Sequence, residues 1–349
     1  MTTLKDIALL AGVSPMTVSR VINGLTVKGE NRAKVEQAME DLNFVPNLVA
    51  RSFRSGRTET IGLIIPSIIA PFFTHLARGV EDAINRAGYK LMLCTHSENI
   101  ERESQYINTL IASRVDGLII TPADEASKPA LELLQANDIP FVSVDRIITG
   151  IESDYIVGDS FESARSLTEY LLNRGHERIA VITGPHSLYT SGERYRGFQS
   201  AMVSRSRPIS PELIRTITHD ADLDSFLLQI KAAISDFLAL PNPPTALFAY
   251  SELVAIQALN VLDALGLRYP DDLDIVCFED VAPLGGLKPR IPAAVQPVLE
   301  MGHLAFDILM QRIEEPDRPY KSVVLKPEYK FSSDPKSRTA RDELGVSIH

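Results

Sequence analysis

The chain has 349 residues, of which 45% are hydrophobic and 23% are charged, and its formal net charge is −10. This length suits two or three domains with buried cores, and the composition is that of a globular protein rather than a disordered or fibrous one. The longest apolar run, 61–73, is interrupted by two prolines and is too short to cross a bilayer. Segment 7–13 lacks the basic leader of a signal peptide, so we expect a cytoplasmic protein that has no contact with a membrane.

The charge is unevenly distributed along the chain. Residues 1–60 carry eight Lys and Arg against six Asp and Glu, so the acidic excess lies entirely in the remainder. A basic N-terminal segment on an acidic body is compatible with a small module that contacts phosphates. Cys94 and Cys277 lie in apolar, strand-like runs and are expected to be buried thiols, not a disulfide or metal ligands.

Three short helices are predicted in the first 45 residues. The first has an apolar stripe at helical spacing and begins at a capping box formed by Thr3 and Asp6; the stripe comprises Leu4, Ile7, Ala8 and Ala11. Ser14 and Pro15 are typical of the start of the second helix. A third helix is expected from about Glu30 to Leu42, and Gly29 is its expected, weak cap.

Two short helices joined at Gly12 and closed by a third describe a helix-turn-helix, although any small three-helix bundle has the same pattern. The exposed face of the second helix favours the helix-turn-helix. This face carries groups that can donate hydrogen bonds to phosphates or base edges, namely Thr17, Ser19, Arg20 and Asn23.

The same segment resembles the DNA-binding headpiece of the lactose/galactose-repressor family of bacterial transcriptional regulators. The resemblance is carried by Leu4-Lys5-Asp6-Ile7-Ala8, by Ala11-Gly12-Val13-Ser14, by the run from Thr17 to Gly24, and by Val45-Pro46-Asn47 followed by Ala50-Arg51-Ser52. It implies a headpiece over 1–45 whose second helix lies in the major groove, with Pro15, Met16 and Arg20 at base-reading positions. The full DNA-binding set that it implies is Ser14, Pro15, Met16, Thr17, Ser19, Arg20, Asn23, Asn47, Ala50, Arg51, Phe53 and Arg54.

The resemblance also implies a hinge over 46–58 that forms a helix only when two copies meet on DNA. A helix this short does not persist alone. Phe53 occupies the position at which the family inserts an apolar wedge into the minor groove, usually leucine. The alternative is that Phe53 packs on the hinge of the partner copy.

Beyond residue 58 the pattern changes to strands that alternate with helices, which predicts parallel sheets covered by helices on both faces. The expected strands are 61–65, 90–94, 117–121, 141–144, 179–183, 213–217, 246–249 and 275–278, and the expected helices are 72–87, 103–113, 131–135, 162–173, 189–202, 225–238 and 253–265. The fold class is therefore α/β: a three-helix headpiece followed by two doubly wound parallel lobes.

The family resemblance continues through this region, in Val144-Asp145-Arg146, Gly175-His176-Glu177-Arg178 and Glu193-Arg194-Tyr195-Arg196-Gly197-Phe198 among other runs. It implies the fold of periplasmic sugar-binding proteins, an effector-binding and dimerisation domain over 59–332, and chain crossings between the lobes near Gly158, Lys288 and Tyr320. Lobe 1 would then comprise 59–158 and 289–319, and lobe 2 would comprise 159–288 and 320–332. Residues 333–349 form a polar tail without leucine heptads, so a tetramerising coil is not expected.

Ligands of such folds bind at the carboxyl ends of the strands. The effector residues expected there are Phe72, Phe73, Asp145, Asp159, Arg194, Tyr250, Ser251, Glu279 and Gln296. One of the two phenylalanines is expected to pack under the following helix instead of stacking on a ligand. By family position Arg194 is the strongest candidate, because its guanidinium can fork onto adjacent hydroxyls or a carboxylate.

The predicted function is that of a ligand-responsive, sequence-specific DNA-binding regulator, a repressor controlled by a sugar or sugar-derived metabolite. Its expected partners are a near-palindromic double-stranded operator, a second copy of the chain and the effector, and no cofactor or metal is expected. The sequence contains no phosphate loop, no nucleophile elbow and no clustered histidines, which argues against an enzyme. The other alternative is a transport-type binding protein with the same two lobes.

Overall fold

The computed structural model of the chain describes residues 2–22, 25–44, 57–218, 223–281 and 291–331. The chain divides into two compact units, Met1–Glu59 and Thr60–His349. Outside the described residues lie 46–56 of the expected hinge, the polar tail, and six of the expected DNA-binding residues: Asn23, Asn47, Ala50, Arg51, Phe53 and Arg54.

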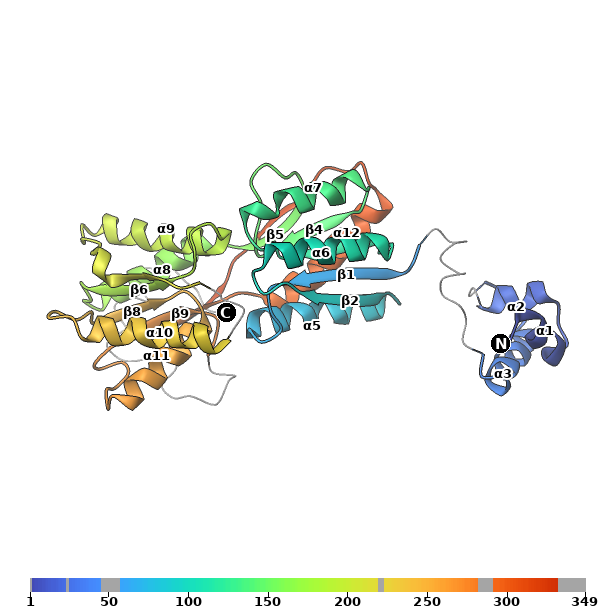
Figure 1. Ribbon diagram of the computed structural model, residues 1–349, viewed down its shortest axis with the longest axis horizontal. Coiled ribbons are helices and arrows are strands. Elements are labelled where there is room, and N and C mark those ends of the chain that lie inside the picture. Colours follow the sequence, from blue (N-terminus) through green and yellow to red (C-terminus); the bar gives the residue numbers. More distant parts are fainter. Residues whose placement is uncertain (1, 23–24, 45–56, 219–222, 282–290, 332–349) are drawn as a thin grey trace, which may run out of the picture. The chain divides into compact units, whose positions relative to one another are not determined.

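The first unit contains the three predicted helices, α1 (Leu4–Ala11), α2 (Pro15–Ile22) and α3 (Gly29–Asp41) (Figure 1). Both hydrogen bonds of the predicted capping box between Thr3 and Asp6 are present, and Gly12 ends α1 with a φ of 64°, a left-handed conformation that glycine adopts without strain. The cap expected at Gly29 is wrong by one residue. Lys28 is the N-cap and makes no side-chain hydrogen bond, so Gly29 is the first helical residue.

The three helices enclose a small core of their own. The apolar stripe predicted for α1 supplies Ile7, Ala8 and Ala11, which pack against Val18 and Val21 of α2 and Val35 of α3. Because this core is complete within residues 2–44, the short helices are stabilised by packing, which isolated helices of eight residues would lack.

The described residues of the second unit form two six-stranded sheets, each with helices on both faces (Figure 1). The strands of the first sheet have the order β11-β5-β4-β3-β1-β2 and are all parallel. The elements of this lobe are β1 (Thr60–Ile65), α5 (Pro71–Arg86), β2 (Lys90–Thr95), α6 (Ile100–Ala112), β3 (Gly117–Ile120), η1 (Glu125–Ser127), α7 (Lys128–Ala136), β4 (Phe141–Val144), β5 (Asp154–Gly158), α12 (Val298–Glu314) and β11 (Ser322–Leu325).

The second sheet has the order β12-β10-β9-β8-β6-β7, and only β12 runs antiparallel to its neighbour. Its elements are α8 (Ser160–Asn173), β6 (Ile179–Thr183), α9 (Tyr189–Ser204), η2 (Pro211–Leu213), β7 (Ile214–Thr216), α10 (Leu223–Leu238), β8 (Ala246–Ala249), α11 (Glu252–Ala264), β9 (Asp274–Phe278), β10 (Ala293–Val295) and β12 (Glu328–Lys330). The predicted α/β fold with two doubly wound lobes is confirmed.

Two of the three expected crossings lie at other positions than the sequence indicated. The first follows β5, as expected near Gly158. The second lies between β10 and α12, because β10 still pairs with β9 of the second sheet; Lys288, near which it was expected, lies outside the described residues. The third lies between β11 and β12, because β11 pairs with β5 of the first sheet, and not near Tyr320.

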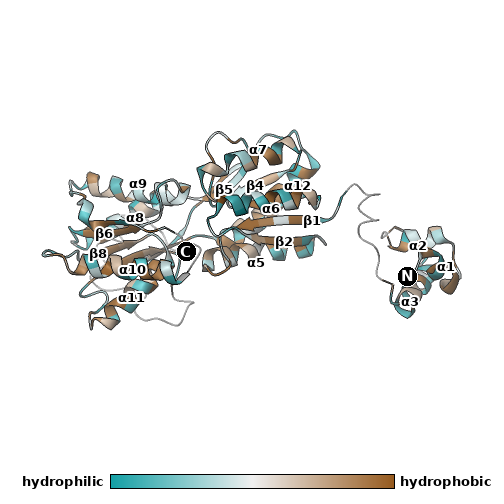
Figure 2. Cartoon of the chain, viewed as in Figure 1, coloured by the Kyte–Doolittle hydropathy of each residue, from teal (hydrophilic) through white to brown (hydrophobic). Residues whose placement is uncertain are grey.

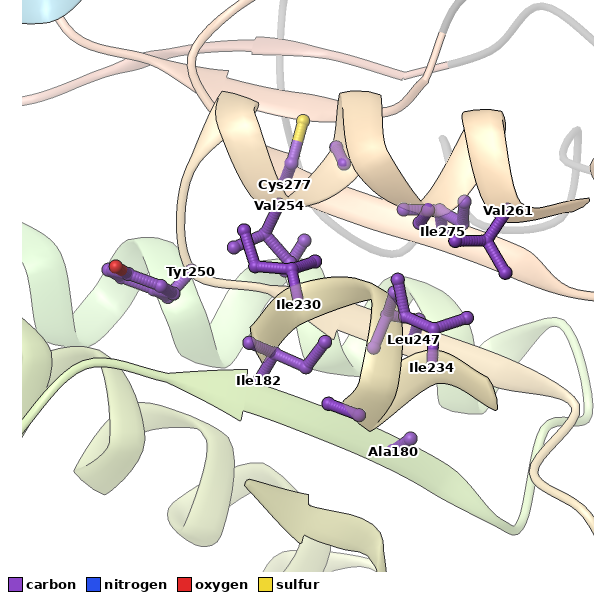
Figure 3. Packing of buried hydrophobic residues seen from close by; sticks show 14 of the residues in the cluster. Ala180, Ile182, Ile230, Ile234, Leu247, Tyr250, Val254, Val261, Ile275 and Cys277 are labelled. Carbon is purple, nitrogen blue, oxygen red and sulfur yellow. The ribbon is translucent and has the colours of Figure 1, made fainter. Parts of the chain in front are cut away.

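Successive side chains of the buried strands point to opposite faces of each sheet, so each strand serves two cores. Leu63 packs beneath α5 and α12, whereas the next residue, Ile64, packs beneath α6 and α7. In the second lobe the strands are likewise hydrophobic, and the helices have hydrophobic and hydrophilic sides (Figure 2). Figure 3 shows one of these cores, in which strand residues such as Leu247 and Ile275 pack with Ile230 and Ile234 of α10.

Glycine allows α5 and α12 to cross closely. A Cβ atom at Gly302 would lie 2.7 Å from both the Leu76 carbonyl oxygen and the Val80 amide nitrogen, and one at Gly79 would meet the Leu299 backbone. Within the first lobe, α5 is therefore tied by direct backbone approach to a helix about 220 residues further along the chain.

His176, a partly buried residue of the second lobe, has polar partners within the fold. His176 contacts Thr245 Oγ1 at 2.9 Å and Asp274 Oδ2 at 3.2 Å, in the turn before β6. Both cysteines are free, and Cys277 is buried. Among the described residues, no helix is long and apolar enough to span a membrane, and no group of three or more His, Cys, Asp or Glu side chains is arranged to hold a metal ion.

Candidate functional site

A cavity of about 190 Å³ lies between the two lobes of the second unit, at the carboxyl ends of their strands. The segments that line it follow β1, β2 and β4 in the first lobe and β6, β8 and β9 in the second. Seven of the nine expected effector residues line this cavity: Phe72, Phe73, Asp145, Arg194, Tyr250, Ser251 and Glu279.

The two other expected residues, Asp159 and Gln296, are not among the lining residues, and both have partners. The Asp159 side chain accepts a hydrogen bond from the Glu162 amide and caps α8. Gln296 is buried behind Glu279 and donates its Nε2 hydrogen to Glu279 Oε1 at 3.0 Å. A side chain at Gly158 would collide with Gln296 Oε1, so the first and second crossings pack directly against each other.

The turns after three strands have an unusual backbone conformation. Ser97 and Glu98 after β2, Asp145 after β4 and Glu279 after β9 all have φ between 50° and 69°, the left-handed region that non-glycine residues avoid. Such conformations cost about 1–3 kcal/mol each and concentrate where side chains must be directed into a site. All four residues line the cavity.

A buried ion pair that sequence analysis did not identify lies on the first-lobe side of the cavity. Arg146 Nη1 and Nη2 donate to Glu98 Oε2 at 2.7 Å and to Oε1 at 2.8 Å. Nη1 also reaches the carbonyl oxygens of Pro122 and Ala123. Burial alone would lower the pKa of Arg146, but the charge and hydrogen bonds of Glu98, together with the charge of Asp145, raise it above its usual value.

On the second-lobe side, Arg194 of α9 has a fixed position and an incomplete set of partners. Its guanidinium donates from Nη1 to the Tyr250 carbonyl oxygen at 2.6 Å and lies 3.8 Å from the centre of the Phe278 ring. The side chain is 8% exposed, and Nε has no hydrogen-bond partner among the described residues. Ser251 Oγ is likewise buried without a partner in this part of the structure.

Three carboxyl groups share the environment of Arg194. Burial raises the pKa of Asp145 and of Glu252, and burial together with the neighbouring Glu252 charge raises the pKa of Glu279 to about 8. Arg194 opposes each of these shifts. The cavity therefore presents hydrogen-bond donors and acceptors side by side, as recognition of a molecule with many hydroxyl groups requires.

The aromatic pair at the start of α5 differs in burial, although both rings pack on the same core. Phe72 is buried and belongs to the core beneath α5 and α12, and Phe73 is only partly buried. The two rings meet edge to face with their centres 5.0 Å apart, and both line the cavity.

Further lining residues were missed by sequence analysis, notably Glu98, Arg146, Thr190, Ser191, Phe226 and Glu252. Arg146 could have been predicted from the sequence, because it follows β4 directly after the predicted site residue Asp145. Thr190 and Ser191 lie one turn before Arg194 on α9. Nothing local distinguishes Glu252 from an ordinary acidic residue in the first turn of a helix.

In the first unit, α2 presents the polar face that its sequence predicts. Ser14 Oγ accepts a hydrogen bond from the Thr17 amide at 3.1 Å and so caps the helix. Pro15, Met16 and Arg20 are exposed, Met16 to 73% of its surface, while Thr17 and Ser19 are partly buried. Arg20 Nη2 donates to the Thr26 carbonyl oxygen at 3.0 Å.

A three-helix unit with an exposed polar helix, joined to two parallel α/β lobes around a cavity, defines the class of ligand-binding regulators of transcription. Comparison with known families identifies the chain more closely. Residues 3–47 match the model of "Bacterial regulatory proteins, lacI family", and residues 58–332 match that of "Periplasmic binding proteins and sugar binding domain of LacI family". The chain belongs to the LacI family of transcriptional regulators.

Similar proteins of known name include repressors. The HTH-type transcriptional repressor PurR of Aliivibrio fischeri is 32% identical over 332 residues, which cover 94% of this chain and 96% of the relative. The ribose operon repressor of Haemophilus influenzae is 34% identical over 328 residues, with coverage of 94% and 96%. Among solved structures, the complex of the transcriptional regulator CelR with cellobiose has a TM-score of 0.69 and 27% identity over 95% of this chain and 99% of that one.

Proposed function

We propose that this regulator is a homodimeric repressor that binds a near-palindromic operator and is controlled by a sugar or sugar-derived metabolite in the cavity between its lobes. The observation that carries the proposal is the cavity itself, in which Arg194 Nε and Ser251 Oγ are buried without partners. Leaving buried donors unsatisfied costs about 1–3 kcal/mol each, and ligand hydroxyl oxygens would satisfy them.

In this proposal the ligand is held from both lobes. Arg194 forks onto adjacent hydroxyls, Asp145 and Glu279 accept hydrogen bonds from others, and Phe73 contacts the apolar face of the ring. Gln296 acts indirectly by holding Glu279 in place. Because contacts come from both lobes, the ligand stabilises one arrangement of the lobes over others, and this shift of population alters operator affinity.

The proposed DNA contacts lie on α2. Pro15, Met16 and Arg20 are its exposed candidates for base readout, and Ser14, Thr17 and Ser19 are candidates for phosphate contacts. Two headpieces related by a two-fold axis would read two half-sites. The hinge contacts of Asn47, Ala50, Arg51, Phe53 and Arg54 belong to the same proposal, although these residues lie outside the described ranges.

The alternative functions are those of a transport-type binding protein and of an enzyme. A transport-type binding protein would use the cavity but would have no use for a helix-turn-helix unit. The matched family model describes regulatory proteins. We therefore also propose, as the sequence predicts, that this regulator has no enzymatic activity.

A truncated chain tests whether the first unit binds the operator and the second unit binds the ligand. A fragment that begins at Thr60 keeps both sheets and their cores, so it should still bind the ligand. Binding would be measured as a rise in melting temperature with ligand concentration. It should also lose specific operator affinity by about 10³-fold or more, because specific binding usually exceeds non-specific binding by that factor. Operator binding by the fragment at the affinity of the full chain would contradict the proposal.

A further inference from the structure

The cavity contains more carboxyl groups than cations. The carboxyl groups are those of Glu98, Asp145, Glu252 and Glu279, and the guanidinium groups are those of Arg146 and Arg194. The bidentate pair with Glu98 and two backbone carbonyls occupy both Nη atoms of Arg146. Arg146 Nε lies 3.8 Å from Asp145 Oδ2, beyond hydrogen-bond distance.

Arg194 is a counter-charge that Asp145, Glu252 and Glu279 share, and Asp145 also lies beside Arg146. Each of the three carboxyl groups lies close enough to Arg194 to feel its charge, and Glu252 also lies within electrostatic reach of both other carboxyl groups. Fully ionised, these four groups would carry two negative charges in excess, and one would remain with Glu279 protonated, the form that its pKa of about 8 favours near neutral pH. A low-dielectric cavity makes such an excess far more costly than water would.

Glu252 lies at the centre of this group and connects the two lobes. It is the first residue of α11 in the second lobe, it is 4% exposed, and its carboxyl group lies near the backbone amide of Phe72 at the start of α5 in the first lobe. The carboxyl group therefore lies at the boundary between the lobes and lines the same cavity as Arg194 and Ser251.

We propose that Glu252 makes the cavity selective against anionic ligands, so that the effector is a polyhydroxylated molecule without a phosphate or carboxylate group. This inference rests on the proposed function of the cavity as the effector site. Ligand hydroxyl groups can donate to the carboxyl oxygens and accept from Arg194 and Ser251, and a ligand amine would complement the excess charge. A phosphate or carboxylate would add to the charge excess, which the unpartnered Nε groups of Arg146 and Arg194 offset only in part.

Matched ligands test this inference on the full chain. Each set would pair an uncharged sugar with its amine, acid and phosphate forms: D-glucose with D-glucosamine, D-gluconate and glucose 6-phosphate, D-ribose with ribonate and ribose 5-phosphate, and adenosine with its 5′-monophosphate. Melting temperature would detect binding, and calorimetry would give the affinities. In any set that binds, we expect the uncharged or amine form to bind at least about tenfold more tightly than its anionic twin.

The variant Glu252→Gln keeps the size of the side chain and one acceptor oxygen but removes the charge. This variant should reduce the ratio of the affinities for the neutral and anionic members of a set by about tenfold. Glu132→Gln, at an exposed position on α7, makes the same charge change outside the cavity and should leave the discrimination unaltered.

Three results would overturn the inference: an anionic compound as the tightest ligand of the wild-type chain, equal discrimination in Glu252→Gln and the wild type, or no binding in any set. If a sugar phosphate or acid both binds and changes operator affinity, only the charge selectivity fails. If no compound binds and none changes operator affinity, the proposed sugar-controlled function fails with it.

Discussion

Replacing Arg194 by methionine should abolish the response to effector while the ligand-free chain binds its operator with an affinity close to that of the wild type. The substitution removes the buried Nε without a partner and leaves Asp145, Glu252 and Glu279 without their shared cation. Those carboxyl groups would then bind protons more tightly and present a different hydrogen-bonding surface to a ligand. Operator affinity, titrated with and without ligand, is the measurement.

Arg196→Met is a suitable control for this experiment. Arg196 lies on the same helix, pairs with Glu193 and has a side chain that is 66% exposed, so its loss should affect neither ligand nor operator binding. A normal effector response in Arg194→Met would remove Arg194 from the ligand site. Loss of operator binding without any ligand would instead assign Arg194 a structural role.

Replacing Arg146 by methionine should destabilise the second unit by about 3–5 kcal/mol, because the substitution leaves Glu98 buried without its cation. The side chains of Arg146 and Glu98 are 7% and 14% exposed, so solvent screens their interaction weakly. The carbonyl oxygens of Pro122 and Ala123 lose a donor as well. The free energy of unfolding, measured with urea, should fall accordingly.

Two further variants separate the loss of the buried ion pair from the effect of losing any arginine. Arg78→Met breaks an exposed pair with Asp82 on α5 and should cost less than about 1 kcal/mol. The double variant Arg146→Met with Glu98→Gln should regain part of the lost stability, because no unpaired charge is then buried. A loss of less than about 1 kcal/mol in Arg146→Met alone would mean that the pair contributes little.

The sequence predicted the repeated strand and helix pattern because each long element carries its own periodicity. Ile61, Leu63 and Ile64 form a continuous apolar strand that is read directly as buried. The crossings were misplaced because the strands that decide them are short and depend on distant partners. β10 has three residues, two of them alanine, and β11 is identified only by its pairing with β5, some 170 residues earlier in the chain.

Seven expected effector residues were found at the cavity because their positions after strands follow from the fold. The ion pair of Arg146 with Glu98 joins residues that are 48 positions apart, and no local pattern links them. Sequence analysis missed Glu252 as a residue of the cavity for a different reason. An acid in the first turn of α11 is favourable for the helix alone, so its second role, at the boundary between the lobes, is visible only in three dimensions.

The most direct test of a ligand-controlled regulator is an operator titration of the full chain at fixed salt concentration. The operator would first be selected from random DNA, and the ligand would come from the melting-temperature screen. We expect a saturating ligand to change the operator Kd by at least about tenfold, in either direction, through the coupling of the cavity to the headpiece. An operator Kd that is the same with and without a ligand that demonstrably occupies the cavity would contradict this account.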